Sequence, residues 1–230
     1  ENQTQQMQAE KMSSASSVSF GKQTTAPTQA PSYSYKDTSK IGATTADEKF
    51  DGVAELLKQT VIGQDTFTES LVLAFKRPFA TGYDSAKPKN TMFIFGKAAH
   101  GKHFGVNAVA KILKSRRIIS YDNLSFLDMA RYGSSSQYDL FLSDLYKALY
   151  ENSDIVLFDN FEKCHASILE VLSSLSQTGT FVMDKRYALS GGNLVEATGA
   201  LIQNSISQIS ANKKFLVFLS EKDERIIPEL

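Results

Sequence analysis

One stretch of the sequence combines residue types and a spacing that suit phosphate binding. Gly96 and Gly101 are separated by four residues and followed by Lys102, which gives the pattern G-x-x-x-x-G-K directly after the apolar residues 92–95. In such a loop the backbone amides close around phosphate oxygens, the following helix presents the positive end of its dipole, and the lysine reaches the terminal phosphates. The sequence therefore predicts a nucleotide-binding loop at residues 96–103.

The residue after the lysine departs from this pattern. A Ser or Thr hydroxyl at that position ligates the magnesium ion that accompanies the nucleotide, and this chain has His103 instead. A protonated imidazole can bond to a phosphate oxygen, or the ring can occupy the magnesium position and block it. His100 also lies within the loop, where its side chain is expected to be solvated.

A second apolar run, which is followed by an aspartate, has part of the sequence pattern that nucleotide hydrolysis requires. Residues 155–158 are wholly apolar and are followed by Asp159, as in a buried strand whose terminal aspartate holds magnesium. The next residue is often a glutamate that polarises the attacking water, but here it is Asn160, whose amide cannot take a proton from water. We therefore expect Asp159 to ligate magnesium only if a nucleotide binds, and hydrolysis to be lost or very weak.

Apolar periodicity predicts the elements that position these residues. Helices are expected from a capping box at Thr45 and Glu48, from an N-cap at Asp65 to an end or bend at Pro78, and at residues 102–113, 138–149 and 168–175. Strands are expected at 92–95, 118–121, 155–158 and 215–219, with a hairpin that joins 181–183 to 187–189. This alternation favours a three-layer α/β fold with a mostly parallel central sheet flanked by helices.

Composition limits the classes of function. The 25 basic and 25 acidic residues cancel, so neither nucleic acid nor a membrane surface is an expected partner. No apolar run approaches the ~18 residues of a membrane span, and we expect a soluble, cytoplasmic protein.

The single Cys164 is expected to be a core or subsurface residue, and three dispersed histidines do not make a metal site. Residues 1–44, rich in Gln, Ser and Thr, predict a disordered or extended linker before a domain at 45–230.

Three short motifs, in their order and spacing, resemble the AAA+ ATPase modules of the Clp/Hsp100 protein unfoldases, especially their second ATPase domain. The motifs are Val61-Ile-Gly-Gln-Asp65, then the strand and the G-x-x-x-x-G-K loop, then Asp159-Asn-Phe-Glu-Lys-Cys-His165. The corresponding family stretches run V-[IV]-G-Q-[DE], G-P-T-G-V-G-K-T and D-E-I-E-K-A-H. The resemblance covers about residues 46 to 230 and implies an AAA+, P-loop NTPase-like large subdomain without the family's helical lid domain.

The resemblance also assigns roles by position. Val61 and Ile62 match the segment that lines the adenine pocket, Lys102 matches the phosphate lysine, and Asp159 matches the aspartate of the magnesium site. Glu221 lies near the position of the family's polar sensor, which is an Asn. Because a carboxylate there would repel a γ-phosphate, this position departs from the family as those of His103 and Asn160 do.

The family's substrate-gripping pore loop should lie between Asp122 and Tyr138. In this chain that segment is short and holds only Arg131-Tyr-Gly133 and serines. The resemblance therefore implies an architecture whose substrate-handling part is also altered.

Two functions remain open. The first is a degenerate AAA+ module, a pseudo-ATPase that acts as a protein-interaction scaffold or as a non-hydrolysing subunit beside other proteins such as AAA+ ring subunits. The alternative is an active ATP-dependent unfoldase or remodelling module, chaperone-like in action, with atypical residues in its nucleotide motifs. ATP or ADP with magnesium and no cofactor at all are equally compatible with the sequence. The departures at His103, Asn160 and Glu221 favour the first function.

Overall fold

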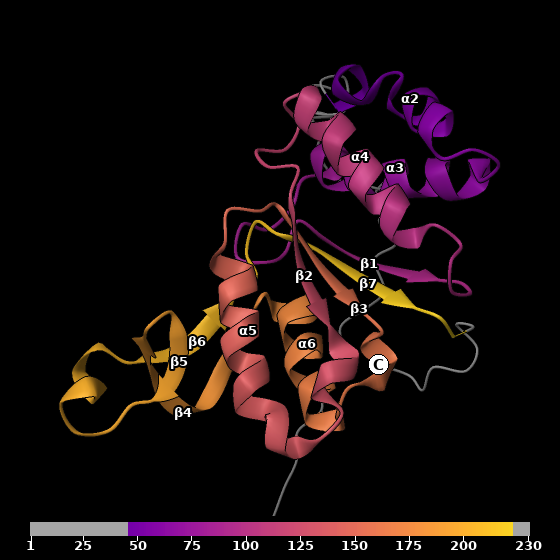
Figure 1. Ribbon diagram of the computed structural model, residues 1–230. Helices are drawn as coiled ribbons and strands as arrows, with labels where there is room; N and C mark the ends of the chain where they lie inside the picture. Colours follow the sequence, from indigo (N-terminus) through magenta and orange to yellow (C-terminus); the bar gives the residue numbers. More distant parts are fainter. Residues whose placement is uncertain (1–45, 223–230) are drawn as a thin grey trace, which may run out of the picture. The chain divides into compact units, whose positions relative to one another are not determined.

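The computed structural model describes residues 46–222 (Figure 1). The expected linker at residues 1–44, the capping residue Thr45 and residues 223–230 lie outside this part. After a helical segment at residues 46–50, the longer helices are α2 (Val53–Thr60), α3 (Asp65–Thr81), α4 (Lys102–Ser115), α5 (Tyr138–Tyr150) and α6 (Ala166–Thr178). Short 3-10 helices are η1 (Met129–Tyr132), η2 (Ser135–Gln137), η3 (Phe161–Lys163) and η4 (Gly199–Asn204). Within residues 46–222 no helix has the length and apolar character needed to cross a membrane.

The strands form two sheets. Their bounds are β1 (Asn90–Phe95), β2 (Leu124–Asp128), β3 (Ile155–Asp159), β4 (Thr180–Ser190), β5 (Asn193–Glu196), β6 (Ile206–Ser210) and β7 (Phe215–Ser220). The larger sheet has four parallel strands in the order β1-β7-β3-β2. The smaller sheet is antiparallel, in the order β5-β4-β6, and extends beside α5 (Figure 1).

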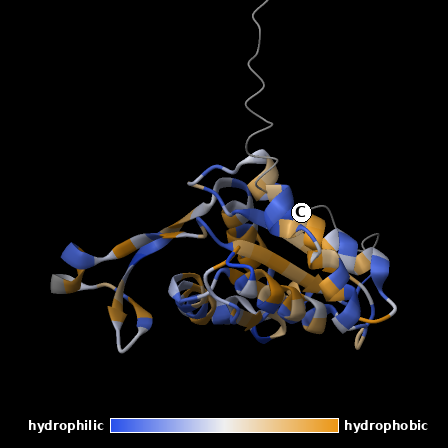
Figure 2. Ribbon diagram, turned by 90° about the horizontal axis from the view of Figure 1, so that it is seen from above, coloured by the Kyte–Doolittle hydropathy of each residue, from blue (hydrophilic) through white to orange (hydrophobic). Residues whose placement is uncertain are grey.

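β7 is one of the two inner strands of the parallel sheet and is buried along its whole length. Because successive strand residues point to opposite faces, Val217 and Leu219 join a core with α2, α3 and α4, whereas Leu216 and Phe218 join a core with α5 and α6. Figure 1 shows these two groups of helices on opposite sides of the sheet, and Figure 2 shows hydrophobic residues concentrated in its strands. The predicted α/β class is therefore confirmed, with helices on both faces of the sheet.

α3 continues through Pro78 to Thr81 rather than ending at the proline. A proline removes the amide that would bond to the carbonyl four residues earlier, here that of Ala74. The Asn90 side chain fills this role, since its Nδ2 donates to the Ala74 carbonyl oxygen at 2.8 Å. At its other end α3 begins at Asp65, with Gln64 rather than Asp65 as the cap. Asn90, at the start of β1, thus replaces the hydrogen bond that α3 loses at Pro78.

The predicted strand at residues 118–121 is wrong, and the second strand is β2, six residues later. Ile118 and Ile119 are buried, which accounts for the strand-like pattern, but they lie in a loop. The amides of Ser120 and Tyr121 donate to Asp154 Oδ2 at 2.6 and 2.9 Å. A carboxylate therefore satisfies backbone groups that a strand would have paired with a neighbour.

The predicted hairpin across residues 184–186 is also wrong. Those three charged residues lie inside β4, which is continuous and exposed there. The turn comes at Gly191 and Gly192, with φ of 57° and 78°, between the paired residues Ser190 and Asn193. Two-residue hairpin turns with positive φ at both positions favour glycine, so the glycine pair and not the charged triplet marks the turn.

We expect Gly179→Ala to destabilise the fold strongly. Gly179 ends α6 with φ of 80°, and a Cβ there would lie 2.2 Å from the Ala86 carbonyl oxygen. Left-handed strain and this clash together should cost about 3 kcal/mol or more of unfolding free energy, measured by urea denaturation. The control is Gly192→Ala, with φ of 78° but no neighbour within 4 Å, which should cost about 1–2 kcal/mol. Equal losses in the two variants would contradict the packing argument.

Candidate functional site

The carboxyl ends of the four parallel strands meet at one edge of the sheet, and a polar residue or glycine lies at each. Gly96 follows β1, Glu221 follows β7, β3 ends in Asp159 and β2 ends in Asp128. Asp128 and Asp159 are register partners in neighbouring strands. The structure therefore brings the predicted loop, Asp159 and Glu221 to the same edge, where open α/β sheets form their ligand crevices.

Lys102 is the first residue of α4, and its side chain folds back onto the loop before it. Its Nζ donates to the carbonyl oxygen of Gly96 at 2.5 Å and to that of Lys97 at 2.9 Å. Positive φ angles of 60° at Ala99 and 74° at Gly101 curl the loop toward the helix. The ammonium thus has two acceptors within the chain, and a phosphate would have to replace them.

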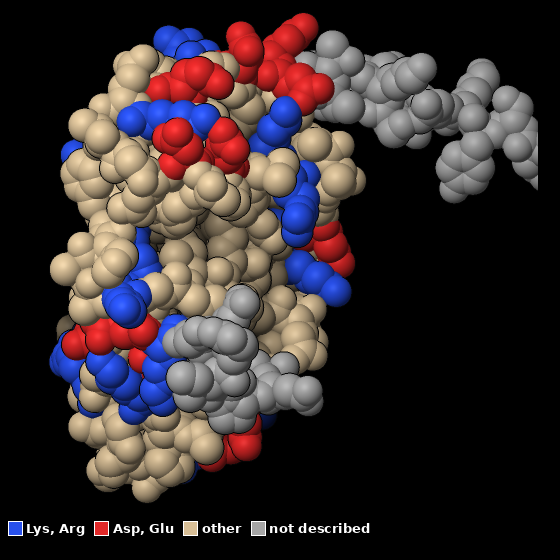
Figure 3. All heavy atoms as spheres, turned by 90° about the vertical axis from the view of Figure 1, so that its right-hand side faces the viewer, with Lys and Arg blue, Asp and Glu red and all other residues tan. Residues whose placement is uncertain are grey.

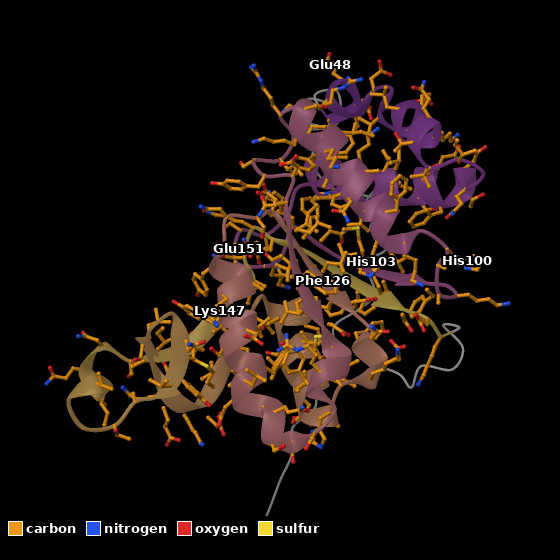
Figure 4. All side chains as sticks on the ribbon, viewed as in Figure 1. Glu48, His100, His103, Phe126, Lys147 and Glu151 are labelled. Carbon is orange, nitrogen blue, oxygen red and sulfur yellow. The ribbon has the colours of Figure 1, made fainter. Side chains whose placement is uncertain are left out.

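His103 reaches from the second position of α4 to the end of β3. Its Nε2 lies 2.9 Å from Asp159 Oδ2, with the two side chains 44% and 20% exposed. The imidazole ring also contacts Phe126 of β2, with ring centroids 5.6 Å apart, and Figure 4 shows His103 and Phe126 next to one another. In a magnesium-dependent site the residues at positions 103 and 159 would share the metal ion. Here the imidazole nitrogen and the carboxylate oxygen contact each other directly.

Asn160 connects two carboxylates. Its Nδ2 donates to Asp128 Oδ1 at 3.1 Å and to Asp159 Oδ2 at 3.3 Å, while its Oδ1 accepts from Lys163 Nζ at 2.6 Å. Its φ of 54° is left-handed, a conformation that asparagine tolerates better than most residues. Lys163 Nζ also lies 3.9 Å from Glu221 Oε2. Both ends of the Asn160 amide are therefore engaged within the chain.

Charges of both signs surround this edge. Figure 3 looks onto the side toward which β1 and β7 end, and shows mixed groups of basic and acidic side chains separated by uncharged surface. A mixed surface of this kind does not create the one-signed field that steers polyanions to a basic site. The part of the chain described here contains no group of three or more His, Cys, Asp or Glu side chains placed to hold a metal ion.

The segment at residues 61–64 lies beside the loop. The Gln64 Nε2 donates to the His100 carbonyl oxygen at 3.0 Å, and the exposed His100 ring contacts the Ala98 carbonyl oxygen at 2.9 Å. Val61 is 3% exposed and belongs to the core under α2, α3 and α4, whereas Ile62 is 84% exposed. Of the two side chains predicted to line an adenine pocket, only that of Ile62 is open to a ligand.

The segment expected to carry the substrate-gripping loop is folded against the body of the domain. Tyr132 in η1 is 1% exposed, and its hydroxyl donates to Asp144 Oδ2 at 2.8 Å. Its carbonyl oxygen accepts from the His165 amide at 2.9 Å. Burial, followed by the bond to Asp144, raises the pKa of the Tyr132 hydroxyl above its usual value. The Tyr132 ring is therefore part of the core.

Asp128, Phe126 and Lys163 belong to the site and were not predicted from the sequence. Asp128 ends the run L-S-F-L-D, which has the same form as I-V-L-F-D at the end of β3. This signal was missed because the strand was expected at residues 118–121. The sequence gives no such signal for Lys163, because its hydrogen bond to Asn160 depends on the turn made by η3.

No protein-family model matches the sequence. The interpretation of this edge therefore rests on its geometry and on the short motifs that meet there.

We expect Asn160→Glu to be less stable than Asn160→Gln. The glutamate would add a third carboxylate beside Asp128 and Asp159, whereas glutamine has the same size and the same backbone strain without the charge. The difference in unfolding free energy should be about 1 kcal/mol at pH 7 and should shrink in acid, where the carboxylates are protonated. A glutamate variant as stable as the glutamine variant at pH 7 would contradict the proposed role of the amide.

Cys164 should react slowly with iodoacetamide at neutral pH. Burial raises the pKa of its thiol to about 11, and the thiol donates to the Phe161 carbonyl oxygen at 3.1 Å. Since the thiolate is the reactive form, the alkylation rate of the folded chain should keep rising above pH 9. A rate that is half-maximal near pH 8.5 and levels off above about pH 9.5, as for a free cysteine, would show that the thiol is not buried in this way.

Proposed function

We propose that this chain is a degenerate AAA+ module of the Clp/Hsp100 type that does not hydrolyse nucleotide and serves as a protein-interaction scaffold or a non-hydrolysing subunit. The observation that carries the proposal is the contact between His103 Nε2 and Asp159 Oδ2 at 2.9 Å. The side chains at the two positions that would share magnesium contact each other, and the metal would have to replace that contact. Without magnesium, the charge that develops on the phosphates in the transition state lacks its main counter-charge.

The other parts needed for hydrolysis support the same proposal. Asn160 stands where a general base is needed, and its amide is bonded to Asp128, Asp159 and Lys163. Glu221, at the end of β7, would place a negative charge near a γ-phosphate. Loss of a general base alone lowers rates by about 10²–10⁴-fold. Several such losses together leave no route to efficient turnover.

The alternative, an active unfoldase, has less support from this geometry. In the family that the sequence resembles, an exposed aromatic loop grips the substrate chain. Of the two aromatic residues between Asp122 and Tyr138, Phe126 lies in β2 beside the His103 ring, and Tyr132 is buried and bonded to Asp144. What favours the alternative is the arrangement of Lys102 and Asp159 at one sheet edge, which is where an ATPase would also need them.

Titration with ATP and magnesium, alongside phosphate release, tests the proposal. We expect no steady hydrolysis, and weak nucleotide binding that does not strengthen when magnesium is added, because Asp159 is held by His103. His103→Thr should make binding magnesium-dependent, since it frees Asp159 and supplies a hydroxyl ligand. Steady hydrolysis that disappears in Lys102→Ala would overturn the proposal.

Assembly needs its own control, because AAA+ modules hydrolyse nucleotide at contacts between subunits. The double variant His103→Thr, Asn160→Glu restores the family residues at both positions. If this variant hydrolyses ATP under conditions where the natural chain does not, the loss is caused by these residues and not by a missing neighbour. Hydrolysis by both chains at equal rates would contradict the account.

A further inference from the structure

The amino ends of the four parallel strands lie at the sheet edge opposite the candidate site, and basic side chains gather there (Figure 1). The end of α4 and the start of the loop to β2, residues 111–117, hold four basic residues and no acidic one. The loops that lead into β1 and β7 add two exposed lysines. These six residues, here called the basic edge, are Lys87, Lys111, Lys114, Arg116, Arg117 and Lys213. Because the charges of the whole chain cancel, the basic edge is a local excess of positive charge.

Asp154 joins the loops of this edge. Its Oδ2 accepts from the amides of Ser120 and Tyr121 at 2.6 and 2.9 Å, and its Oδ1 lies 3.1 Å from Lys89 Nζ. The side chains of Asp154 and Lys89 are each 12% exposed. The loop before β2 is thus fixed to the starts of β1 and β3, while the Asp154 carboxylate is largely buried.

The exposed carboxylates of the same loops are fewer than the basic groups. Within residues 46–222, the loops and the end of α4 expose the six residues of the basic edge and three acidic residues, Asp84, Asp122 and Glu151. Asp84 Oδ1 accepts from the Ala86 amide at 2.9 Å, and Glu151 Oε2 accepts from the Ser125 hydroxyl at 3.0 Å. Two of the three acidic side chains therefore already accept a hydrogen bond from the chain itself.

Lys87 and Lys213 lie side by side in this edge. The Lys213 amide donates to the Lys87 carbonyl oxygen at 3.3 Å, and the Lys89 amide donates to the Lys214 carbonyl oxygen at 2.8 Å. The exposed side chains of Lys87 and Lys213 thus start from adjacent backbone positions, and their like charges repel each other. An anionic partner would relieve this repulsion.

A groove of about 500 Å³ lies at the end of α4. The described residues that line it are Lys114, Ser115, Arg117, Ile118, Ile119 and Ser120. Arg117 has a left-handed φ of 57°, and its amide donates to the Lys114 carbonyl oxygen at 2.9 Å. Helix ends of this form usually have glycine at that position, because a side chain is unfavourable there. The arginine therefore lies in the groove against the local conformational preference.

Lys114 lies beside an exposed aromatic ring. Its Nζ donates to the Ser120 carbonyl oxygen and lies 5.7 Å from the centroid of the Tyr121 ring, which is 41% exposed. The guanidinium of Arg117 can bind a carboxylate through two parallel hydrogen bonds. The end of α4 thus combines two cationic groups with apolar surface, which suits a peptide that carries carboxylates.

The charge of the chain favours a short acidic segment over a nucleic acid as the partner. Nucleic-acid-binding domains are commonly strongly basic, whereas this chain has no net charge and a sequence pI of about 7.1. The starts of β7 and β2 flank the start of β3, so roughly 10 Å separates them. An extended chain of about six to eight residues spans about 20 Å or more, which is enough to contact the groove and Lys213 together.

We propose that the basic edge binds an acidic segment of a partner protein in an extended conformation. One carboxylate of the segment pairs with Arg117 in the groove, and others pair with Lys87 and Lys213. The proposal goes beyond the proposed function, because it involves the opposite edge of the sheet and no residue of the candidate site.

The test uses the full chain and fluorescein-labelled octaglutamate, with labelled octaglutamine as the uncharged control, in fluorescence anisotropy. Octaglutamate should bind, and its affinity should fall about fivefold or more when the salt concentration rises from about 0.05 M to about 0.3 M, because these ion pairs are exposed to solvent. Octaglutamine should not bind. No binding of octaglutamate, or equal binding of the two peptides, would overturn the proposal.

Two charge reversals locate the site. Lys213→Glu and Arg186→Glu change the net charge equally, but Arg186 is an exposed residue of β4, in the other sheet. Lys213→Glu should weaken octaglutamate binding about fivefold, whereas Arg186→Glu should change it by less than about twofold. Equal losses in the two variants would show a general attraction without a site and would refute the proposal.

Arg117→Gly separates the role of the charge from that of the fold. Glycine suits a φ of 57°, so this variant should be at least as stable as the natural chain, while its affinity for octaglutamate falls about fivefold. Arg117→Lys keeps the charge without the planar fork and should lose only about twofold. Unchanged affinity in Arg117→Gly would contradict binding in the groove.

Labelled octathymidylate tests the other class of polyanion. We expect it to bind more weakly than octaglutamate. Tighter binding of octathymidylate would identify a nucleic acid as the partner and would overturn the proposal.

Discussion

The position of β7 is the constraint on which the rest of the fold depends. It is the last strand in the sequence that the structure describes, yet it lies between β1 and β3 and is buried on both faces. Its odd-numbered residues face the core with α2, α3 and α4, and its even-numbered residues face the core with α5 and α6. Neither core is complete without β7, so the helices on both faces of the sheet pack on the same strand.

The position of β7 between β1 and β3 also helps to form the candidate site. Four parallel strands have their carboxyl ends at one edge, and this brings Lys102, the adjacent pair Asp159 and Asn160, and Glu221 together from three distant parts of the sequence. At that edge each group that nucleotide chemistry would need has a partner within the chain. Lys102 is bonded to loop carbonyls and Asn160 to its neighbours, and the His103 ring contacts Asp159. The departures from the family motifs therefore form one connected set of contacts.

The sequence predicted most of this framework because continuous apolar runs and helical periodicity are strong local signals. β1, β3, β7 and the four helices from α3 to α6 agree with those signals within a few residues. The errors arose where a side chain or a turn overrode propensity: Asp154 bonds to the loop at Ser120 and Tyr121, and two glycines moved the hairpin turn past the charged triplet.

Local sequence patterns also predicted most residues of the candidate site, but not the contacts between them. Motifs located Lys102, His103, Asp159 and Asn160, but motifs do not encode which side chains touch. The contact of His103 with Asp159 and the reach of Lys163 to Asn160 depend on how α4 and η3 are placed on the sheet. Asp128 was missed because its strand was assigned to the wrong residues.

The most direct test of the central claim is nitrogen-15 NMR of the His103 ring during titration with magnesium and ATP. We expect the Nε2 resonance to keep the shift of a nitrogen in contact with a carboxylate, with no change at millimolar magnesium. A magnesium-dependent shift of that resonance in the presence of ATP would show that the metal displaces His103 from Asp159. That result would contradict the claim that the site is blocked.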